Sequence, residues 1–143
     1  MFPEPIKNFI DNFSRLPSLG PRLATRLAFY LINLDPASLK KLYEALDSLK
    51  TLNRCGKCFF LKETRSNVCN FCSDPKRDKA TIAIIEKETD LLSLESTGHF
   101  KGQYMILGEL PERGVLETSH KLRLAKLKEI IQKELDGKAK EII

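Results

Sequence analysis

The stretches Cys55-Gly56-Lys57-Cys58 and Cys69-Asn70-Phe71-Cys72, with ten residues between them, contain all four cysteines of the chain. Tetrahedral zinc binds four thiolates at about 2.3 Å, and each Cys-x-x-Cys turn can supply two of them. Gly56 and Asn70 tolerate the positive φ that tight turns often require. Two disulfides or a redox pair are the alternatives, but disulfides need an oxidising compartment and redox sites seldom come as two matched pairs. The spacing predicts a structural zinc site.

The composition is that of a chain able to bury a core. Its 143 residues are 42% hydrophobic, enough for one ordinary domain or two to three small modules. The start, Met1-Phe2-Pro3-Glu4-Pro5, has neither the basic residues nor the apolar run of a secretory signal. No stretch has the apolar length of a membrane helix. We therefore expect a cytoplasmic protein with reduced cysteines and no membrane partner.

Positive charge is distributed unevenly along the chain. The net charge is +5; residues 1–80 carry 14 Lys/Arg against 8 Asp/Glu, and residues 81–143 carry 10 against 11. The whole excess lies in the part that contains the cysteines. Such an asymmetry favours a polyanion as partner of the first half of the chain.

The residues before the cysteines have the periodicity of three helices. A first apolar face has spacings of three and four and is formed by Ile6, Phe9, Ile10 and Phe13. A second helix is predicted to begin at Pro21, and a third to begin with the cap and first residue Asp35-Pro36. The second helix is predicted to bury Leu23, Leu27, Leu31 and Leu34. The third is predicted to bury Leu39, Leu42, Leu46 and Leu49.

After the cysteines the period changes to that of alternating strands and helices. The continuous apolar run Thr81–Ile85 is typical of a strand buried on both faces of a parallel sheet. A short helix over 90–97, a strand over 104–107 and a longer helix ending at Gly137 follow, and residues 141–143 start a third strand. The order βαβαβ predicts a parallel sheet with right-handed crossovers. Because the sequence stops within an element, we expect this domain to be incomplete.

The loop Leu16-Pro17-Ser18-Leu19-Gly20-Pro21 between the first two helices has the form of a helix-hairpin-helix. A glycine lets the backbone approach a phosphate, and a helix start offers free N–H groups and a positive dipole end. Arg22 and Arg26 are four residues apart, so both guanidinium groups project from one face near that helix start. The pattern suits contact with a nucleic-acid backbone, and an ordinary helical turn with two exposed arginines is the alternative.

Three stretches follow one another along the chain. They are Leu16-Pro17-x-Leu19-Gly20-Pro21-Arg22-x-Ala24-x-Arg26-Leu27-Ala28-Phe29, then Cys55-x-x-Cys58 to Cys69-Asn70-x-Cys72-Ser73-Asp74-Pro75-x-Arg77, and then Ile84-Ile85-Glu86-x-x-x-Asp90-Leu91-x-x-Leu94-Glu95-x-Thr97-Gly98-x-Phe100-x-Gly102-x-Tyr104. In this order they resemble RecR, the bacterial recombination mediator, and the resemblance covers residues 6 to 108 without a break. In that family they are the hairpin motif, the four-cysteine zinc finger and the start of a Toprim domain. After Leu107-Gly108 the chain departs from the family, with Glu109-Leu110-Pro111-Glu112-Arg113-Gly114 in place of a Ser-Pro and glycine-rich loop.

The resemblance implies a non-enzymatic DNA-repair adaptor, associated with the nucleoid. It implies sequence-independent binding of single- and double-stranded DNA, partnership with RecO and RecF in loading recombinase at gapped DNA, and self-association through the N-terminal module. By position, Gly20, Arg22 and Arg26 match the DNA-contacting hairpin, and Glu86 matches the Toprim glutamate, which with Asp90 forms an acidic partner-binding surface. The same comparison makes Cys55, Cys58, Cys69 and Cys72 the ligands of a structural Zn²⁺.

We thus predict an α+β protein of several modules. They are a helix-hairpin-helix module over 1–53, a four-cysteine zinc finger over 54–79 and a partial α/β Toprim domain with a parallel sheet over 80–143. Two other functions stay open. One is a magnesium-dependent phosphoryl-transfer enzyme that uses Glu86, although one carboxylate cannot assemble such a metal site alone. The other is a zinc-stapled protein-interaction module with no DNA role.

Overall fold

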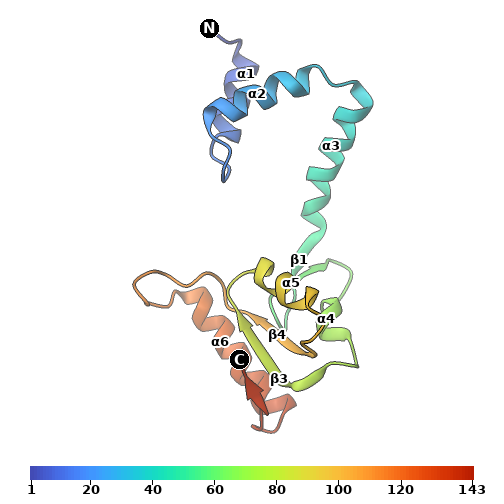
Figure 1. Cartoon of the computed structure of the whole chain (residues 1–143), viewed down its shortest axis with the longest axis vertical. Coiled ribbons are helices and arrows are strands. Elements are labelled where there is room, and N and C mark those ends of the chain that lie inside the picture. Colours follow the sequence, from blue (N-terminus) through green and yellow to red (C-terminus); the bar gives the residue numbers. More distant parts are fainter. The chain divides into compact units, whose positions relative to one another are not determined.

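The computed structural model describes residues 1–143, which divide into two units, Met1–Leu49 and Lys50–Ile143. The first unit consists of helices and the second combines helices with two small sheets (Figure 1). Together they give the predicted α+β organisation. No helix in the chain has the length and apolar character needed to span a membrane.

The helices of the first unit are α1 (Glu4–Phe13), α2 (Pro21–Ile32) and α3 (Pro36–Ser48). Pro21 and Pro36 occupy first helical positions, where a missing N–H costs nothing. The predicted cap of α3 is confirmed, since the Asp35 carboxylate accepts the Ser38 N–H at 2.9 Å. The start and type of these helices therefore follow from local sequence signals.

The apolar stripes of α2 and α3 do not have the predicted burial. In α2 the buried residues are the small Ala24 and Ala28, one turn apart, whereas Leu23 is largely exposed. In α3 nothing is buried, and the predicted core residues Leu42 and Leu46 are exposed. Helices α1 and α2 are in contact, and the fully buried residues of α2 are alanines and not the larger leucines.

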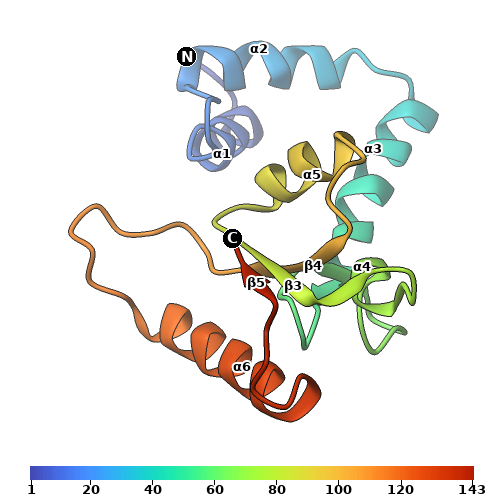
Figure 2. The same ribbon diagram turned by 60° about the horizontal axis from the view of Figure 1, so that its bottom comes forward.

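The second unit is built on three parallel strands in the order β4-β3-β5. The strands are β3 (Asp78–Ile85), β4 (Gly102–Ile106) and β5 (Glu141–Ile142), joined through α5 (Glu88–Ser96) and α6 (Thr118–Glu134). Figure 2 shows β3 and β5 side by side and running in the same direction. The βαβαβ prediction and the parallel pairing are both confirmed.

Side chains of the central strand β3 alternate between two cores. Ala83 packs with Leu91 of α5 and with Tyr104 and Ile106 of β4. On the other face Ile82 packs with Met105 and Leu127, which α6 contributes. Helices therefore cover both faces of the sheet, which explains why the Thr81–Ile85 run is apolar at successive positions.

The cysteine-containing part of the chain lies against this sheet. Its elements are the antiparallel pair β1 (Leu52–Arg54) and β2 (Leu61–Glu63) and the short helix α4 (Asn70–Ser73); a 3₁₀ turn, η1 (Leu49–Thr51), precedes them. The Ile106 N–H at the end of β4 donates to the Cys58 carbonyl at 2.9 Å. At the start of β4, a Cβ on Gly102 would lie 2.4 Å from the Thr81 carbonyl, so only glycine allows the strands to approach this closely.

Candidate functional site

The four cysteine sulfurs form one compact cluster. All four lie within 4.8 Å of one another, with Cys55 Sγ 3.9 Å from Cys72 Sγ and Cys58 Sγ 3.4 Å from Cys69 Sγ. None is in a disulfide, and three of the four are buried. Four thiolates around one tetrahedral ion at 2.3 Å would be separated by about 3.8 Å. The cluster therefore has the dimensions and the donor chemistry to hold a metal ion.

Local backbone geometry brings the two pairs of cysteines together. The first turn is closed by the Phe59 N–H donating to the Cys55 carbonyl at 3.1 Å, and the residue with positive φ is Phe59 (63°). The second pair surrounds the start of α4, with Cys69 as its N-cap. Gly56 and Asn70 thus do not supply the left-handed conformation for which their residue types were singled out.

The crowded sulfurs perturb one another's ionisation. The pKa of Cys55 lies below its usual value because of its hydrogen bonds, first with Cys58 and then with Cys69 and Cys72. The pKa of Cys72 lies above its usual value because of its hydrogen bonds, first with Cys55 and then with Cys58 and Cys69. Backbone N–H groups of Phe60 and Cys69 approach sulfurs at 3.4 Å. Four thiolates require a cation between them, so metal binding would release protons.

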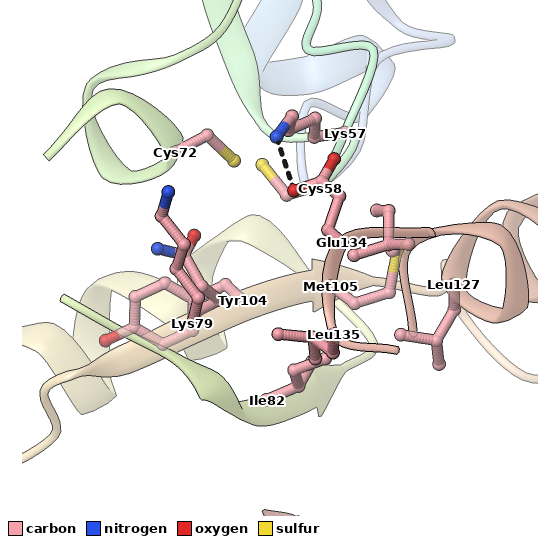
Figure 3. Close-up of a pocket in the computed structure, with 12 residues that line it drawn as sticks. Lys57, Cys58, Cys72, Lys79, Ile82, Tyr104, Met105, Leu127, Glu134 and Leu135 are labelled. Carbon is pink, nitrogen blue, oxygen red and sulfur yellow. Dashed lines mark hydrogen bonds and ion pairs between the residues drawn. The ribbon is translucent and has the colours of Figure 1, made fainter. Parts of the chain in front are cut away.

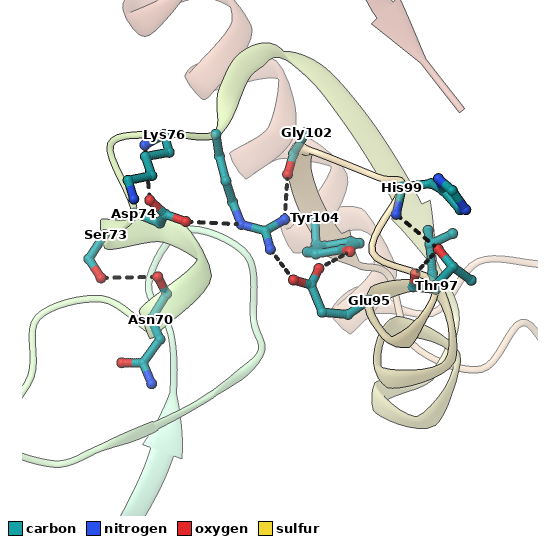
Figure 4. A network of polar contacts seen from close by, with 11 residues as sticks. Asn70, Ser73, Asp74, Lys76, Glu95, Thr97, His99, Gly102 and Tyr104 are labelled. Carbon is teal, nitrogen blue, oxygen red and sulfur yellow. Dashed lines mark hydrogen bonds and ion pairs between the residues drawn. The ribbon is translucent and has the colours of Figure 1, made fainter.

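A buried arginine connects the cysteine module to the sheet (Figure 4). The Arg77 side chain is 8% exposed, donates to the Gly102 carbonyl at 3.0 Å and forms an ion pair with Glu95. Its guanidinium lies 5.1 Å from the ring centre of Phe71 and 5.3 Å from that of Tyr104. The arginine thus fixes α4, α5 and β4 to one another.

The carboxylate in this network is held in its charged form. Burial acts to raise the pKa of Glu95, but hydrogen bonds from Tyr104 and Arg77 outweigh it and leave the pKa below its usual value. Burial and the bond to Glu95 raise the pKa of Tyr104 to about 12. The hydrogen bonds from Tyr104 and Arg77 therefore compensate for the burial of the charged Glu95 carboxylate.

Replacing Arg77 by methionine is expected to destabilise the second unit by about 3–5 kcal/mol, because Glu95 loses its cationic partner in a partly buried site. The measurement is denaturant unfolding followed by circular dichroism. Lys76→Met is the matched control, since the neighbouring Lys76 is exposed and forms no ion pair. Equal unfolding midpoints for the two variants would contradict this role for Arg77.

A second ion pair and a small cavity lie where the cysteine module meets α6. Lys57 Nζ is 2.8 Å from the Glu134 carboxylate, so the two side chains form an ion pair (Figure 3). The cavity has a volume of about 40 Å³; its lining combines Lys57, Cys58, Cys72 and Lys79 with apolar residues of the sheet and α6. The space is large enough for ordered water only.

In the first unit, the hairpin residues line an open groove at the start of α2. The groove has a volume of about 420 Å³ and is formed by Gly20, Pro21, Arg22, Leu23 and Arg26. Both arginines are exposed, and neither has a carboxylate within 4 Å. Two guanidinium groups without acidic partners therefore face solvent one turn apart.

The hairpin backbone has its left-handed residue at Ser18 and leaves the space in front of Gly20 open. Gly20 has φ −70°, and the residue in the left-handed region is Ser18 (φ 62°). The N–H groups of Leu23 and Ala24 donate to the Gly20 carbonyl at 3.0 and 2.9 Å, and Pro21 has no N–H. The helix start can therefore offer an anion the Arg22 N–H and the arginine side chains, with open space in front of Gly20.

The acidic residues after β3 do not converge on a second metal site. Glu86 directly follows the strand and is exposed, whereas Asp90 accepts the Lys87 N–H at 3.2 Å at the start of α5. Lys87 in turn lies 3.2 Å from Glu109. The only group of three or more potential ligands close enough to hold an ion in residues 1–143 is the cysteine cluster.

Two residues of α6 have structural roles that sequence reasoning missed. His120 is 4% exposed; its Nδ1 accepts the Glu117 N–H at 3.1 Å and its Nε2 lies 2.9 Å from the Glu109 carbonyl, which fits the neutral Nε2–H tautomer. Arg123 donates to the Ile106 carbonyl at 3.1 Å and covers the Phe59 ring at 5.1 Å. Arg123 therefore connects α6 to the end of β4 and to the cysteine module.

Comparison with known proteins gives one family throughout. The family model described as RecR, helix-hairpin-helix, matches residues 6–50. The recombination protein RecR of Corynebacterium glutamicum is 41% identical over 76% of this chain and 49% of the relative. That of Frankia alni is 35% identical over 96% of this chain and 67% of the relative. In Lactococcus lactis subsp. cremoris the identity is 35% over 99% of this chain and 70% of the relative. The chain thus spans about half to seven tenths of these relatives, and it belongs to the RecR family.

Proposed function

We propose that this chain is a non-enzymatic DNA-binding protein of recombinational repair. The observation that carries the proposal is the hairpin groove, where Arg22 and Arg26 are exposed without acidic partners. Such guanidinium groups contact phosphates, which position a protein on DNA without reading its sequence. Binding of the purified chain to labelled single- and double-stranded oligonucleotides of unrelated sequence tests it.

The partners proposed for the whole protein follow from its family. Its relatives are named recombination proteins. We place this chain with RecO and RecF, in the loading of recombinase at gapped or single-stranded DNA in the nucleoid region of the cytoplasm. The exposed Glu86 and the neighbouring Asp90 are the proposed partner surface. Loss of RecO or RecF binding in Glu86→Lys, with DNA binding unchanged, would support that assignment.

We propose Zn²⁺ as the ion of the cysteine cluster, held by Cys55, Cys58, Cys69 and Cys72. Four thiolates at tetrahedral spacing are the donor set of structural zinc, and they leave no position open for a substrate. The ion would stabilise the module that packs against β4. In the proposed organisation this module, over 54–79, separates the hairpin module over 1–53 from the sheet over 80–143.

Catalysis by magnesium is not favoured by the carboxylates present. Glu86 belongs to no group of three or more residues close enough to hold an ion together, and two-metal phosphoryl transfer needs several ligands. We expect no magnesium-dependent nicking or relaxation of plasmid DNA by the chain. Nicking that disappears in Glu86→Gln would overturn the non-enzymatic assignment.

We also propose self-association through the first unit. Tyr30, Leu42, Tyr43 and Leu46 are 44–64% exposed on α2 and α3, although they continue the apolar pattern of these helices. Several large apolar side chains exposed on one small helical unit are typical of interaction sites. A second copy of the same unit presents the same surface.

Leu42→Asp combined with Leu46→Asp is expected to convert the oligomer into a monomer, because two charges would have to be buried at the contact. Mass measured by size-exclusion chromatography with light scattering reports the change. Lys41→Asp, on the same exposed helix, is the control and should keep the wild-type mass. Identical masses for all three proteins would exclude this face of α3 from the contact.

A further inference from the structure

The parallel sheet gathers lysines that are far apart in the sequence. Strands that run in the same direction begin at the same edge, so the segments before β3, β4 and β5 meet there. The Asp78 N–H donates to the Lys101 carbonyl at 2.9 Å, and the Lys140 N–H donates to the Ala80 carbonyl at 2.8 Å. These bonds place the three strand starts next to one another.

Five exposed lysines occupy this amino edge, which we define as Lys76, Lys79, Lys101, Lys138 and Lys140. Neighbouring strands are about 4.8 Å apart, so three strands spread the ammonium groups over about 10 Å before the reach of the side chains is counted. The pattern comes from topology and cannot be seen as a cluster in the sequence.

Of the acidic groups near this edge, Asp74 and Asp78 are engaged in hydrogen bonds, whereas Asp136 and Glu141 are exposed beside the start of β5. The Asp78 carboxylate accepts the Ala80 N–H and the Thr81 hydroxyl, both at 2.9 Å, and these bonds lower its pKa. It also lies 3.9 Å from Lys140, whereas Asp74 accepts the Lys76 N–H at 2.9 Å. Four of the five lysines, Lys76, Lys79, Lys101 and Lys138, have no carboxylate within 4 Å.

The opposite edge of the sheet carries four carboxylates, two of which are paired with Arg54 and Lys87. Glu86, Glu88, Asp90 and Glu109 follow the carboxyl ends of β3 and β4. The first unit has little net charge, six Lys/Arg against five Asp/Glu in residues 1–49, so the remaining 18 against 14 belong to residues 50–143. Most of the excess positive charge of the chain therefore lies in the second unit, and the amino edge gathers several of its unpaired lysines.

We infer that the amino edge is a second contact surface for the phosphate backbone of a nucleic acid, separate from the hairpin groove. This inference rests on the proposed DNA-binding function and extends it to the second unit. Flexible lysine side chains act as point charges and suit phosphate contacts that do not depend on base sequence. The surface adds affinity and salt dependence but no sequence preference.

The test uses the full chain with Lys76→Gln, Lys101→Gln and Lys138→Gln combined, one change from each strand start. The control removes three charges elsewhere in the same unit, at the exposed Arg113, Lys121 and Lys128, also by glutamine. Binding to a labelled single-stranded oligonucleotide is measured by fluorescence anisotropy over a range of salt concentrations. Poly-glutamate is the competitor that represents an acidic protein.

We expect the amino-edge variant to bind at least tenfold more weakly at low salt. The slope of log affinity against log salt should be smaller by about 2, because each lost contact with single-stranded DNA contributes about 0.7. The control variant should stay close to wild type. Equal affinities and slopes for the two variants, while the wild type binds DNA, would overturn this inference alone.

Two further outcomes are also decisive. A wild-type chain that binds no DNA at low salt overturns the proposed function together with this inference. Poly-glutamate that binds wild type as tightly as DNA, but binds the amino-edge variant weakly, overturns the nucleic-acid assignment in favour of an acidic protein partner.

Discussion

Cys55→Ser is expected to unfold the second unit and to abolish metal binding. Cys55 is completely buried, and its sulfur lies among the other three. A structural zinc site contributes about 10–16 kcal/mol in isolated zinc-finger peptides, and domains have a total stability of about 5–15 kcal/mol. Losing one of four ligands therefore removes a free energy comparable to the whole stability. Metal content and thermal unfolding by circular dichroism measure the two effects.

The loss should extend beyond the cysteine module. Cys58 accepts the Ile106 N–H of β4, and Phe71 packs on Tyr104 with ring centres 5.4 Å apart. Chelation of the metal from the wild type should give the same spectrum as Cys55→Ser. Ser66→Ala, in the exposed loop between the cysteine pairs, is the matched control and should melt like wild type. A Cys55→Ser protein with wild-type melting would contradict a stabilising metal.

Arg22→Gln combined with Arg26→Gln is expected to weaken DNA binding by at least tenfold at low salt, to a similar extent for every sequence. Both side chains line the hairpin groove, and neither has a carboxylate partner that would lose its ion pair in the variant. The salt slope should fall by about 1.4 on single-stranded DNA and by about 1.8 on duplex, since each phosphate contact contributes about 0.7 or 0.9. Fluorescence anisotropy over a range of salt concentrations measures both quantities.

The control for this pair is Lys40→Gln with Lys41→Gln, which removes two exposed charges from α3 in the same unit. This control distinguishes the loss of a local DNA contact from the effect of a general loss of positive charge. If the two double variants lose affinity equally, the hairpin groove has no special role in the interface. If only the arginine variant is weakened, the contact is local.

The sequence was sufficient for features that depend on spacing. Two Cys-x-x-Cys pairs predicted a sulfur cluster, and the sulfurs lie at the separations that a tetrahedral ion requires. The unbroken apolar run Thr81–Ile85 predicted a strand covered on both faces, and α5 and α6 provide that cover. In both cases one local pattern is compatible with few structures.

Burial in the helical unit could not be predicted in the same way. A leucine at helical spacing gives the same pattern whether it faces its own core, as Leu31 partly does, or solvent, as Leu46 does. The residues of α2 that are buried are Ala24 and Ala28, which a search for large apolar residues does not find. Periodicity identifies an apolar face but not what covers it.

Ion pairs between residues far apart in the chain could not be predicted from the sequence either. Arg77 pairs with Glu95, and Lys57 pairs with Glu134, 77 positions further along the chain. Each cation has several acidic residues at comparable distances in sequence, and only the packing of α5 and α6 selects the partner. The lysines at the amino edge are likewise brought together by the arrangement of the strands and not by their spacing in the sequence.

The most direct test of the central claim is titration of the wild-type chain, with its metal bound, into labelled DNA at low salt and again at higher salt. Single- and double-stranded oligonucleotides of two unrelated sequences serve as ligands. Sequence-independent DNA binding predicts equal affinities for the two sequences of each type, falling linearly with salt on logarithmic axes. No binding at low salt, or binding to one sequence only, would contradict it.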